Sequence, residues 1–320
     1  MPFPILEELE RCHGKQPKHP RGSLPAEINR KDAGYIKMQL KYKTCGEHMQ
    51  VNRFKQIEYL TFPLLDKAGM VRHLFSTRMG GVSEGIYASM NLSYSRGDKK
   101  EAVDENFRRI AEIFDSTPDR IVCSKQTHTT NVRVVTKKDC GKGVVRPLDY
   151  DDVDGLITDE AGIILCTSYA DCVPLYFVDT KHRAIGLGHS GWRGTVNRMG
   201  ESVLSAMKEA YGTNPQDVLA AIGPSICRDC YEVGGEVAEA FKEKFPKEWR
   251  SFIKDGKEQG KYQLDLWEAN RRILLGAGIL EKNLAVTDIC TCCNSKYLFS
   301  HRASHGKRGN LAAFMELRKS

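Results

Sequence analysis

Two short stretches of this 320-residue chain, residues 170–175 and 188–194, gather side chains of the kinds that bind metal ions. They contain Cys172 and His189, and His128 completes a set of one cysteine and two histidines. Zinc accepts imidazole and thiolate ligands together, and three protein ligands leave a fourth position open for chemistry. These residue types therefore indicate a catalytic zinc site and make an enzyme the leading interpretation.

The three residues lie far apart in the sequence, so their spacing alone does not show that they meet. Each sits at or beside the end of a predicted strand, where polar side chains converge over a rigid sheet. The alternative is a surface His128, a small buried Cys172 and a hydrogen-bonding His189 in a loop. Asp171 favours the metal site, because a carboxylate near a metal can orient water or carry a proton. A solvated surface aspartate is the competing interpretation, and the residue types leave the choice open.

Two groups of cationic residues are candidates for binding an anion. Arg78 stands just before the pair Gly80-Gly81, and a guanidinium beside exposed backbone amides suits a phosphate or a carboxylate. On sequence alone, a surface turn with one charge is the favoured interpretation. The second group forms either an anion pocket or a solvated face; it consists of His301, Arg302, His305, Lys307 and Arg308.

Two further patterns are discounted. Residues 186–191 match the G-x-G-x-x-G pattern of dinucleotide sites, but the strand predicted at 218–222 ends without an acid for a ribose hydroxyl. Trp192 crowds the same turn and stands where the G-x-S-x-G nucleophile elbow requires its last glycine. We therefore expect neither a dinucleotide site nor a serine hydrolase.

The cysteines pose a separate question. Cys227-x-x-Cys230 and Cys290-x-Cys292-Cys293 are able to combine as a four-cysteine zinc or iron–sulfur site. The first pair lies in a loop bounded by Gly and Pro that need not approach the second group, so we expect independent thiols. Eleven cysteines in a chain this long without an export signal indicate thiols and metal ligands, not a disulfide scaffold.

From Tyr35 onward, short apolar runs alternate with amphipathic segments, with neither an internal repeat nor a linker between two cores. Strands are expected at residues 36–42, 132–136, 163–167, 175–178, 184–188, 218–222, 285–287 and 311–317. Helices are expected at 103–114, 196–207, 235–245 and 266–275, the last with Asp265 as N-cap. The sequence thus predicts a single mixed α/β domain over residues 35–320. A flexible basic extension with a short helix at 5–11 precedes it over residues 1–34.

Composition restricts the partners. The chain has 48 Lys and Arg residues against 41 Asp and Glu, a net charge of +7 that suits anionic small molecules. The basic residues of the first third form no stripe with interleaved aromatics, which disfavours nucleic-acid binding. No apolar run approaches a membrane span, and acidic residues occupy the N-terminus where a secretory signal would be apolar. We expect a cytoplasmic monomer.

A series of motifs runs in one order from about residue 59 to residue 317. They are Phe75-Ser76-Thr77-Arg78-Met79-Gly80-Gly81-Val82-Ser83, Asn91-Leu92, Gln126-Thr127-His128, Asp154-Gly155-Leu156, Ala170-Asp171-Cys172-Val173-Pro174-Leu175, His189-Ser190-Gly191-Trp192-Arg193-Gly194, Ile222-Gly223-Pro224 and Cys230-Tyr231-Glu232-Val233. In these motifs the chain resembles the laccase-domain, or YfiH-like, family. Members of that family are also called polyphenol oxidases and are now described as purine nucleoside phosphorylases.

The resemblance implies one mixed α/β domain with a zinc ion held by His128, Cys172 and His189. It implies that adenosine, inosine and methylthioadenosine are split with phosphate to the free base and (methylthio)ribose 1-phosphate, and that adenosine is deaminated. It further implies catalytic or phosphate-handling roles for Asp171 and Arg78.

Other cations are candidates from their charge. Arg193 is a further candidate for the catalytic anion site. Residues 300–309 depart from the family pattern S-Y-R-R-D-G-x-T-G-R, so the resemblance assigns no roles at this end. Arg302, His305 and Arg308 are candidates there for binding substrate or phosphate.

Three alternatives stand beside this interpretation. Copper also accepts Cys and His ligands, but the chain lacks the H-x-H pairs of multicopper oxidases, which disfavours oxidase activity. A thiol-dependent hydrolase would use Cys172 as nucleophile, with His128 or His189 as base. A noncatalytic partner of cell-envelope or division proteins would need none of the three residues.

Overall fold

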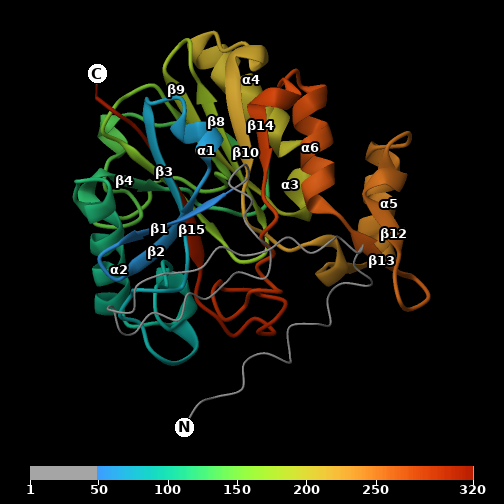
Figure 1. Cartoon of the computed structure of the whole chain (residues 1–320), viewed down its shortest axis with the longest axis horizontal. Helices are drawn as coiled ribbons and strands as arrows, with labels where there is room; N and C mark the ends of the chain where they lie inside the picture. Colours follow the sequence, from blue (N-terminus) through green and yellow to red (C-terminus); the bar gives the residue numbers. More distant parts are fainter. Residues whose placement is uncertain (1–48, 320) are drawn as a thin grey trace, which may run out of the picture.

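Two six-stranded sheets lie face to face in residues 49–319, the part of the chain that this computed structural model describes (Figure 1). The predicted extension over 1–34, the helix at 5–11 and the strand at 36–42 lie outside these residues. Helices cover the outer face of each sheet, which gives four layers in the order helix, sheet, sheet, helices. The predicted single mixed α/β domain is confirmed.

The first sheet has the strand order β1-β2-β3-β15-β7-β4. Its strands are β1 (Gln50–Phe54), β2 (Ile57–Thr61), β3 (Val71–Ser76), β15 (Leu311–Leu317), β7 (Ile164–Tyr169) and β4 (Ile121–Cys123). Neighbours run antiparallel except β4 and β7, which are parallel. The C-terminal strand β15 therefore lies in the middle of a sheet that begins near residue 50.

The second sheet has the order β14-β10-β8-β9-β6-β5. Its strands are β14 (Leu284–Val286), β10 (Val218–Ile222), β8 (Val173–Asp179), β9 (Ala184–Ser190), β6 (Gly155–Thr158) and β5 (Val132–Val134). A hairpin of β8 and β9 occupies its centre, and β10 pairs with β14 in parallel. A separate antiparallel sheet contains β11 (Glu232–Gly234), β13 (Lys261–Leu264) and β12 (Ile253–Asp255). With α5 (Gly235–Lys244) it forms a lobe at one side of the molecule (Figure 1).

Three apolar layers hold these elements together. Buried side chains of both sheets, Phe75 and Tyr176 among them, fill the space between the sheets. Phe107 on α2 (Lys100–Ile113) packs against the outer face of the first sheet. On the second sheet the outer layer is built by α3 (Trp192–Val196), α4 (Met199–Tyr211) and α6 (Leu266–Gly276), and α5 packs on α3 and the third sheet. Continuous apolar runs such as β10 and β15 are what burial on both faces requires.

The seven strands predicted within the described residues are all present, and β10 and β15 have the predicted bounds. Four helices also lie where amphipathic periodicity places them, and Asp265 caps α6 by accepting a hydrogen bond from the Glu268 amide at 3.0 Å. The prediction of one continuous helix at 196–207 is wrong. The segment belongs to two helices, α3 (Trp192–Val196) and α4, because Arg198 adopts a left-handed conformation between them.

The G-x-G-x-x-G segment is part of strand β9 and not a phosphate-binding turn. A Cβ atom at Gly186 would lie 3.0 Å from Val203 on α4, so this glycine lets helix and strand approach closely. The discounting of a dinucleotide site is consistent with this role.

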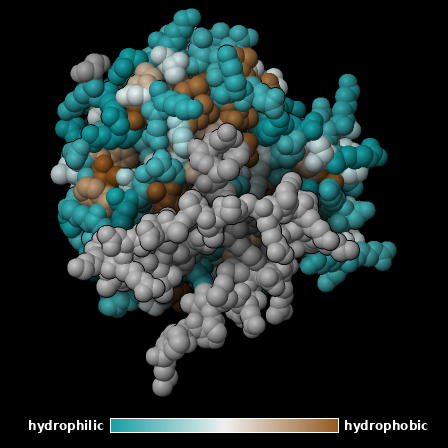
Figure 2. Space-filling model, viewed as in Figure 1, coloured by the Kyte–Doolittle hydropathy of each residue, from teal (hydrophilic) through white to brown (hydrophobic). Residues whose placement is uncertain are grey.

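The outer surface gives little further information. On the face shown in Figure 2, the atoms outside the grey region are mainly hydrophilic, with smaller hydrophobic patches between them. Among residues 49–319, none of the helices combines the length and the apolar character that crossing a membrane would need.

Candidate active site

The hairpin of β8 and β9 brings Cys172 and His189 together. Cys172 directly precedes β8. His189 on β9 lies opposite Pro174, which follows Cys172 by two residues. His128 reaches the same place from the loop between β4 and β5. The ligand atoms of the three residues all lie within 4.8 Å of one another. One zinc ion holds sulfur at about 2.3 Å and nitrogen at about 2.0 Å, so this spacing fits a single shared ion.

Gly191 makes this approach possible. A Cβ atom there would lie 3.0 Å from Cδ2 of His128 and 3.1 Å from Sγ of Cys172, so any side chain would press on two of the three residues. His189 is buried, Cys172 is half-buried and His128 is exposed. The group is therefore anchored in the sheet and open to solvent on one side, as a metal site that accepts a substrate must be.

Asp154 orients two of the three residues, and the sequence interpretation gave it no role. Its Oδ1 atom is 2.7 Å from Nδ1 of His189 and accepts a hydrogen bond from the His128 amide at 3.1 Å. Its Oδ2 atom accepts hydrogen bonds from the amides of Thr127 and Thr129, both at 3.0 Å. Asp154 is fully buried and directly precedes β6, which pairs with β9. A carboxylate that bonds one ring nitrogen leaves the other nitrogen of His189 for a metal.

The electrostatics of this group favour a thiolate. Burial opposes ionisation of Cys172, but His189 and His128 outweigh it and lower the pKa of the thiol to about 6. Burial likewise opposes protonation of His189, but Cys172 and Asp154 raise the pKa of the imidazole to about 9. Burial also disfavours the Asp154 carboxylate, yet hydrogen bonds from His189 and two backbone amides hold its pKa below the usual value.

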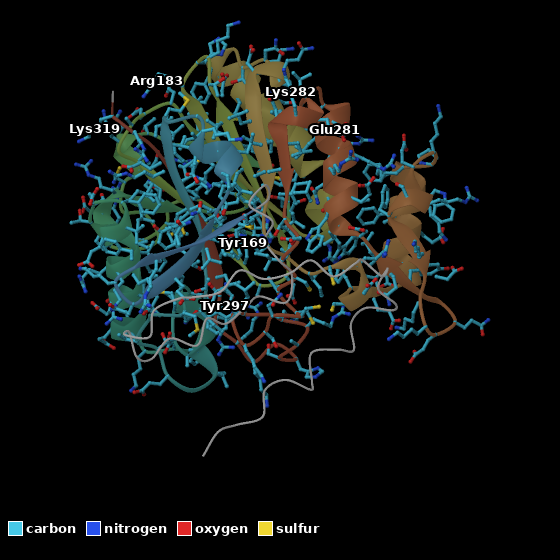
Figure 3. All side chains as sticks on the ribbon, in the orientation of Figure 1. Tyr169, Arg183, Glu281, Lys282, Tyr297 and Lys319 are labelled. Carbon is cyan, nitrogen blue, oxygen red and sulfur yellow. The ribbon has the colours of Figure 1, made fainter. Side chains whose placement is uncertain are left out.

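Tyr169, labelled in Figure 3, is buried and packs against His189. Its ring centroid is 5.5 Å from that of His189, and its hydroxyl donates a hydrogen bond to the Gly188 carbonyl at 2.9 Å. Tyr169 lies on β7 of the first sheet, whereas Gly188 and His189 lie on β9 of the second. The contact between the two sheets thus supports the proposed ligand.

Asp171 lies beside the proposed ligands, in a left-handed conformation with φ +84°. Its Oδ1 atom accepts a hydrogen bond from the Thr291 hydroxyl at 2.6 Å, and its Oδ2 atom accepts one from the Arg302 amide at 2.7 Å. Only 8% of the residue is exposed, so its carboxylate is held in one orientation. Neither Thr291 nor Tyr231 was a predicted site residue. Burial raises the pKa of the Tyr231 hydroxyl, and the charge of Cys172 raises it further.

Arg78 and Arg308 line a small cavity of about 230 Å³ together with Lys307. Arg78 donates hydrogen bonds to the carbonyls of Ala88 and Ser295, and its guanidinium lies 4.5 Å from the centroid of the Phe299 ring. Arg78 lies half-buried in a bend, and these contacts hold its side chain in place.

Arg308 is buried, and its Nε atom has no hydrogen-bond partner within residues 49–319. Burial and the nearby Arg96 lower its pKa to about 10, and the charges of Asp171 and Cys172 act on it in the opposite direction. The rest of the guanidinium has partners, since Nη1 donates hydrogen bonds to the Gly309 carbonyl at 3.1 Å and to Asn310, and Nη2 lies 3.3 Å from Nδ1 of His301.

The other predicted cations are placed differently. Arg193 is exposed at the start of α3, with its guanidinium 4.3 Å from the Trp192 ring centroid. Arg302 donates hydrogen bonds to the carbonyls of Cys230 and Glu232 at 3.0 Å and 2.9 Å, which uses its guanidinium to join two loops. His305 is exposed in a turn and does not line the cavity of Arg78 and Arg308.

Two alternative sites are resolved by burial and proximity. Ser190 is fully buried and hydrogen-bonded to Thr195 and Asn270, which agrees with the absence of a serine nucleophile elbow. The expectation of independent thiols is wrong, because four cysteines converge in a second group. The sulfur atoms of Cys227, Cys230, Cys290 and Cys293 all lie within 4.8 Å of one another.

Comparison with known proteins agrees with the fold. Purine nucleoside phosphorylase YlmD from Geobacillus stearothermophilus is 38% identical over 257 residues, covering 79% of this chain and 92% of that protein. Adenosine deaminase RL5 from an unknown prokaryotic organism is 35% identical over 236 residues, covering 71% and 87%. The crystal structure of YlmD from G. stearothermophilus has a TM-score of 0.77 at 34% identity, covering 84% of this chain and 99% of that one. Residues 72–318 match the family described as multi-copper polyphenol oxidoreductase laccase, and the chain therefore belongs to that family.

Proposed function

We propose that this protein is a zinc-dependent purine nucleoside phosphorylase with an associated adenosine deaminase activity. Its substrates would be adenosine, inosine and methylthioadenosine, cleaved with phosphate to the free base and (methylthio)ribose 1-phosphate. The observation that carries the proposal is the convergence of His128, Cys172 and His189. A cavity lined by Arg78 and Arg308 adjoins the loop whose Arg302 amide holds Asp171, the neighbour of Cys172. The names of the relatives YlmD and RL5 support the same two activities.

The chain's residues supply a fitting set of ligands for zinc. The soft thiolate of Cys172 and the imidazoles of His128 and His189 are the donors that zinc accepts together. Bound there, zinc would supply a Lewis acid that polarises the substrate or activates water at neutral pH. Asp154 would hold His189 in the required orientation, and the pairing with histidine keeps Cys172 ionised.

Phosphorolysis needs a site for inorganic phosphate next to the sugar. Arg308 has a buried Nε donor without a partner among residues 49–319, and a phosphate oxygen would accept its hydrogen bond. Arg78 in the same cavity would place a second guanidinium beside the anion. Because both side chains are held by the protein before phosphate arrives, little ordering would be needed on binding.

Both reactions also need a group that moves protons at the purine. We assign this role to Asp171, the carboxylate next to Cys172, which Thr291 and the Arg302 amide hold in place. In phosphorolysis it would pass the proton of hydrogen phosphate to the departing base, as a phosphate oxygen bonds to the sugar carbon and the bond from that carbon to the base breaks. In deamination it would move protons to and from the exocyclic amine and the attacking water.

One experiment tests the proposal directly. Metal content is measured by elemental analysis, and turnover of the three nucleosides is followed with and without phosphate by separating the products. We expect bound zinc in the wild-type protein and base release that depends on phosphate. The Cys172→Ala variant should lose the zinc of this site and turnover together. Turnover that persists in this variant, or base release that does not depend on phosphate, would count against the proposal.

A thiol-dependent hydrolase is the second candidate, because the histidines lower the pKa of Cys172 to about 6. The two functions differ in how iodoacetamide acts on the metal-loaded protein. A zinc ligand is shielded from alkylation, whereas a nucleophile is alkylated with loss of turnover. Protection of Cys172 by zinc and its alkylation after chelation would favour the phosphorylase.

A further inference from the structure

We propose that Cys227, Cys230, Cys290 and Cys293 bind a second zinc ion with a structural role, apart from the site that contains Cys172. The four sulfur atoms lie within 4.8 Å of one another, and the groups of this kind found among residues 49–319 are this one and the Cys/His group. Two thiolates that share a tetrahedral zinc ion at about 2.3 Å lie about 3.8 Å apart. The four sulfurs are therefore already gathered at the scale of one ion.

The chain supplies these sulfurs as two arms of equal spacing. Cys227 and Cys230 form one C-x-x-C arm, and Cys290 and Cys293 form the other. Such paired arms are typical of structural zinc sites. The parallel pairing of β10 with β14 explains why arms 63 residues apart meet, since it continues into a bridge between Ser225 and Cys290. Both arms leave the same end of the sheet side by side.

The surroundings suit thiolate ligands. Sγ of Cys290 accepts hydrogen bonds from the backbone amides of Cys227 at 3.2 Å and of Cys293 at 3.4 Å. Amide donors directed at a sulfur stabilise its negative charge. Cys227 and Cys290 are buried and the other two are half-buried. Four thiolates complete a tetrahedral shell without an open position, which is the arrangement of a structural and not a catalytic zinc ion.

Two other fates of these cysteines fit less well. The Sγ atoms of Cys230 and Cys293 are 3.4 Å apart, whereas a disulfide holds its sulfurs at about 2.0 Å. A cluster of several iron and sulfide atoms needs its four cysteines further apart than one ion does, and here they surround the space for one ion. A single metal bound by four thiolates is the arrangement that matches the distances.

The second ion would brace one wall of the proposed active site. Thr291, between the two cysteines of the second arm, donates its hydroxyl to Asp171. The carbonyl of Cys230 accepts a hydrogen bond from the guanidinium of Arg302, whose own amide bonds Asp171. Both groups that hold the Asp171 carboxylate are thus tied to the four-cysteine group. The site is nevertheless independent of nucleoside chemistry, so it stands or falls by metal binding alone.

The test counts metal ions in the purified full-length protein by elemental analysis. We expect about two zinc ions per chain in the wild type, one from each group of ligands. Cys172→Ala leaves the four cysteines intact and should retain about one zinc ion. Cobalt loaded into this variant should show the intense sulfur-to-metal charge-transfer absorption of a four-thiolate site. Cys293→Ser should lose one zinc ion and keep the other, if the variant folds.

Cys292→Ser is the matched control, because Cys292 lies within the second arm but outside the group of four sulfurs. It should retain both zinc ions. A wild-type protein with one zinc ion that Cys172→Ala abolishes would overturn the proposal, and this result does not require that any four-cysteine variant folds. Iron in place of zinc, or cysteines recovered as disulfides from freshly purified reduced Cys172→Ala protein, would overturn it as well. A wild-type protein that binds both zinc ions but converts no nucleoside would refute the proposed function and leave this inference intact.

Discussion

Asp154 shows how much of the proposed chemistry depends on a residue that need not touch substrate. Its carboxylate contacts Nδ1 of His189 and accepts hydrogen bonds from three backbone amides of the loop that carries His128. It therefore fixes the ring orientation of one proposed ligand and the position of another. Carboxylates in this position behind a metal-binding histidine commonly control metal affinity.

The Asp154→Asn variant should bind zinc at the Cys/His site about 10- to 100-fold more weakly, because the loss of charge weakens the hold on His189. Competition with a chelator of known affinity measures the change. Asp151→Asn is the control, since Asp151 is exposed nearby and its contact with Lys125 is as long as 3.9 Å. Equal zinc affinities for both variants would show that Asp154 does not support the ligand.

A second prediction concerns Arg308 and the binding of phosphate. If its unpartnered Nε atom meets phosphate, Arg308→Gln should raise the KM for phosphate about 10- to 100-fold, the range of a charge-assisted hydrogen bond. The KM for nucleoside should change much less. Arg183→Gln, at an exposed residue labelled in Figure 3, is the control and should leave both constants unchanged. A uniform fall in kcat without a change in either KM would assign Arg308 to folding or catalysis instead.

Residue types made His128, Cys172 and His189 candidates for a soft metal site, and the family resemblance favoured them over the alternatives. They were not enough to find Asp154, whose role appears only when strand pairing places β6 beside β9. The four-cysteine group was misjudged for the same reason. Its two arms meet through the pairing of β10 with β14, and a sequence carries no local sign of which strands become neighbours.

At the scale of elements, the turn from β9 into α3 determines how tightly the proposed ligands pack. Gly191 has φ −69° and ψ −178°, an extended conformation that alanine also adopts, so a Gly191→Ala variant suffers no backbone strain. Its methyl group would instead press on His128 and Cys172. We expect zinc affinity at this site to fall roughly tenfold or more while the melting temperature of the metal-free protein stays similar.

The control for this variant is Gly276→Ala at the end of α6, where an added Cβ atom would meet no atom within 4 Å. This substitution should leave zinc affinity unchanged and stabilise the fold by up to about 1 kcal/mol, because alanine loses less backbone freedom than glycine. Titration of zinc into both metal-free variants checks the pair. Wild-type affinity in Gly191→Ala would mean that the ligands have more room than the structure indicates.

The elements that sequence patterns predicted share one property, an apolar pattern strong enough to be read alone. Strand β15 is buried along its length, and α2 places Val103, Phe107 and Ile110 on one face. Strand β1 was missed because its residues are mostly exposed, and β3 because Arg72 and His73 interrupt its apolar run. These strands are formed by pairing with neighbours, and β-propensity depends strongly on such context.

At the scale of the whole molecule, the two sheets act together because groups bridge them near the site. Tyr169 on the first sheet supports His189 on the second, and Tyr176 on the second sheet bonds the Leu74 carbonyl on the first. Most of the other side chains in the space between the sheets are apolar, and they give stability without direction. Hydrogen bonds across this layer fix how one sheet is placed on the other.

Two tyrosines test this idea as a matched pair. Tyr176→Phe removes the 3.1 Å hydrogen bond to Leu74 and should lower the free energy of unfolding by about 1 kcal/mol. Tyr211→Phe removes a buried hydroxyl that has no partner within residues 49–319, so stability should stay equal or rise. Urea denaturation of both variants measures the difference. Because each variant loses the same single oxygen from the same kind of side chain, equal losses would mean that the inter-sheet hydrogen bond contributes nothing to holding the sheets together.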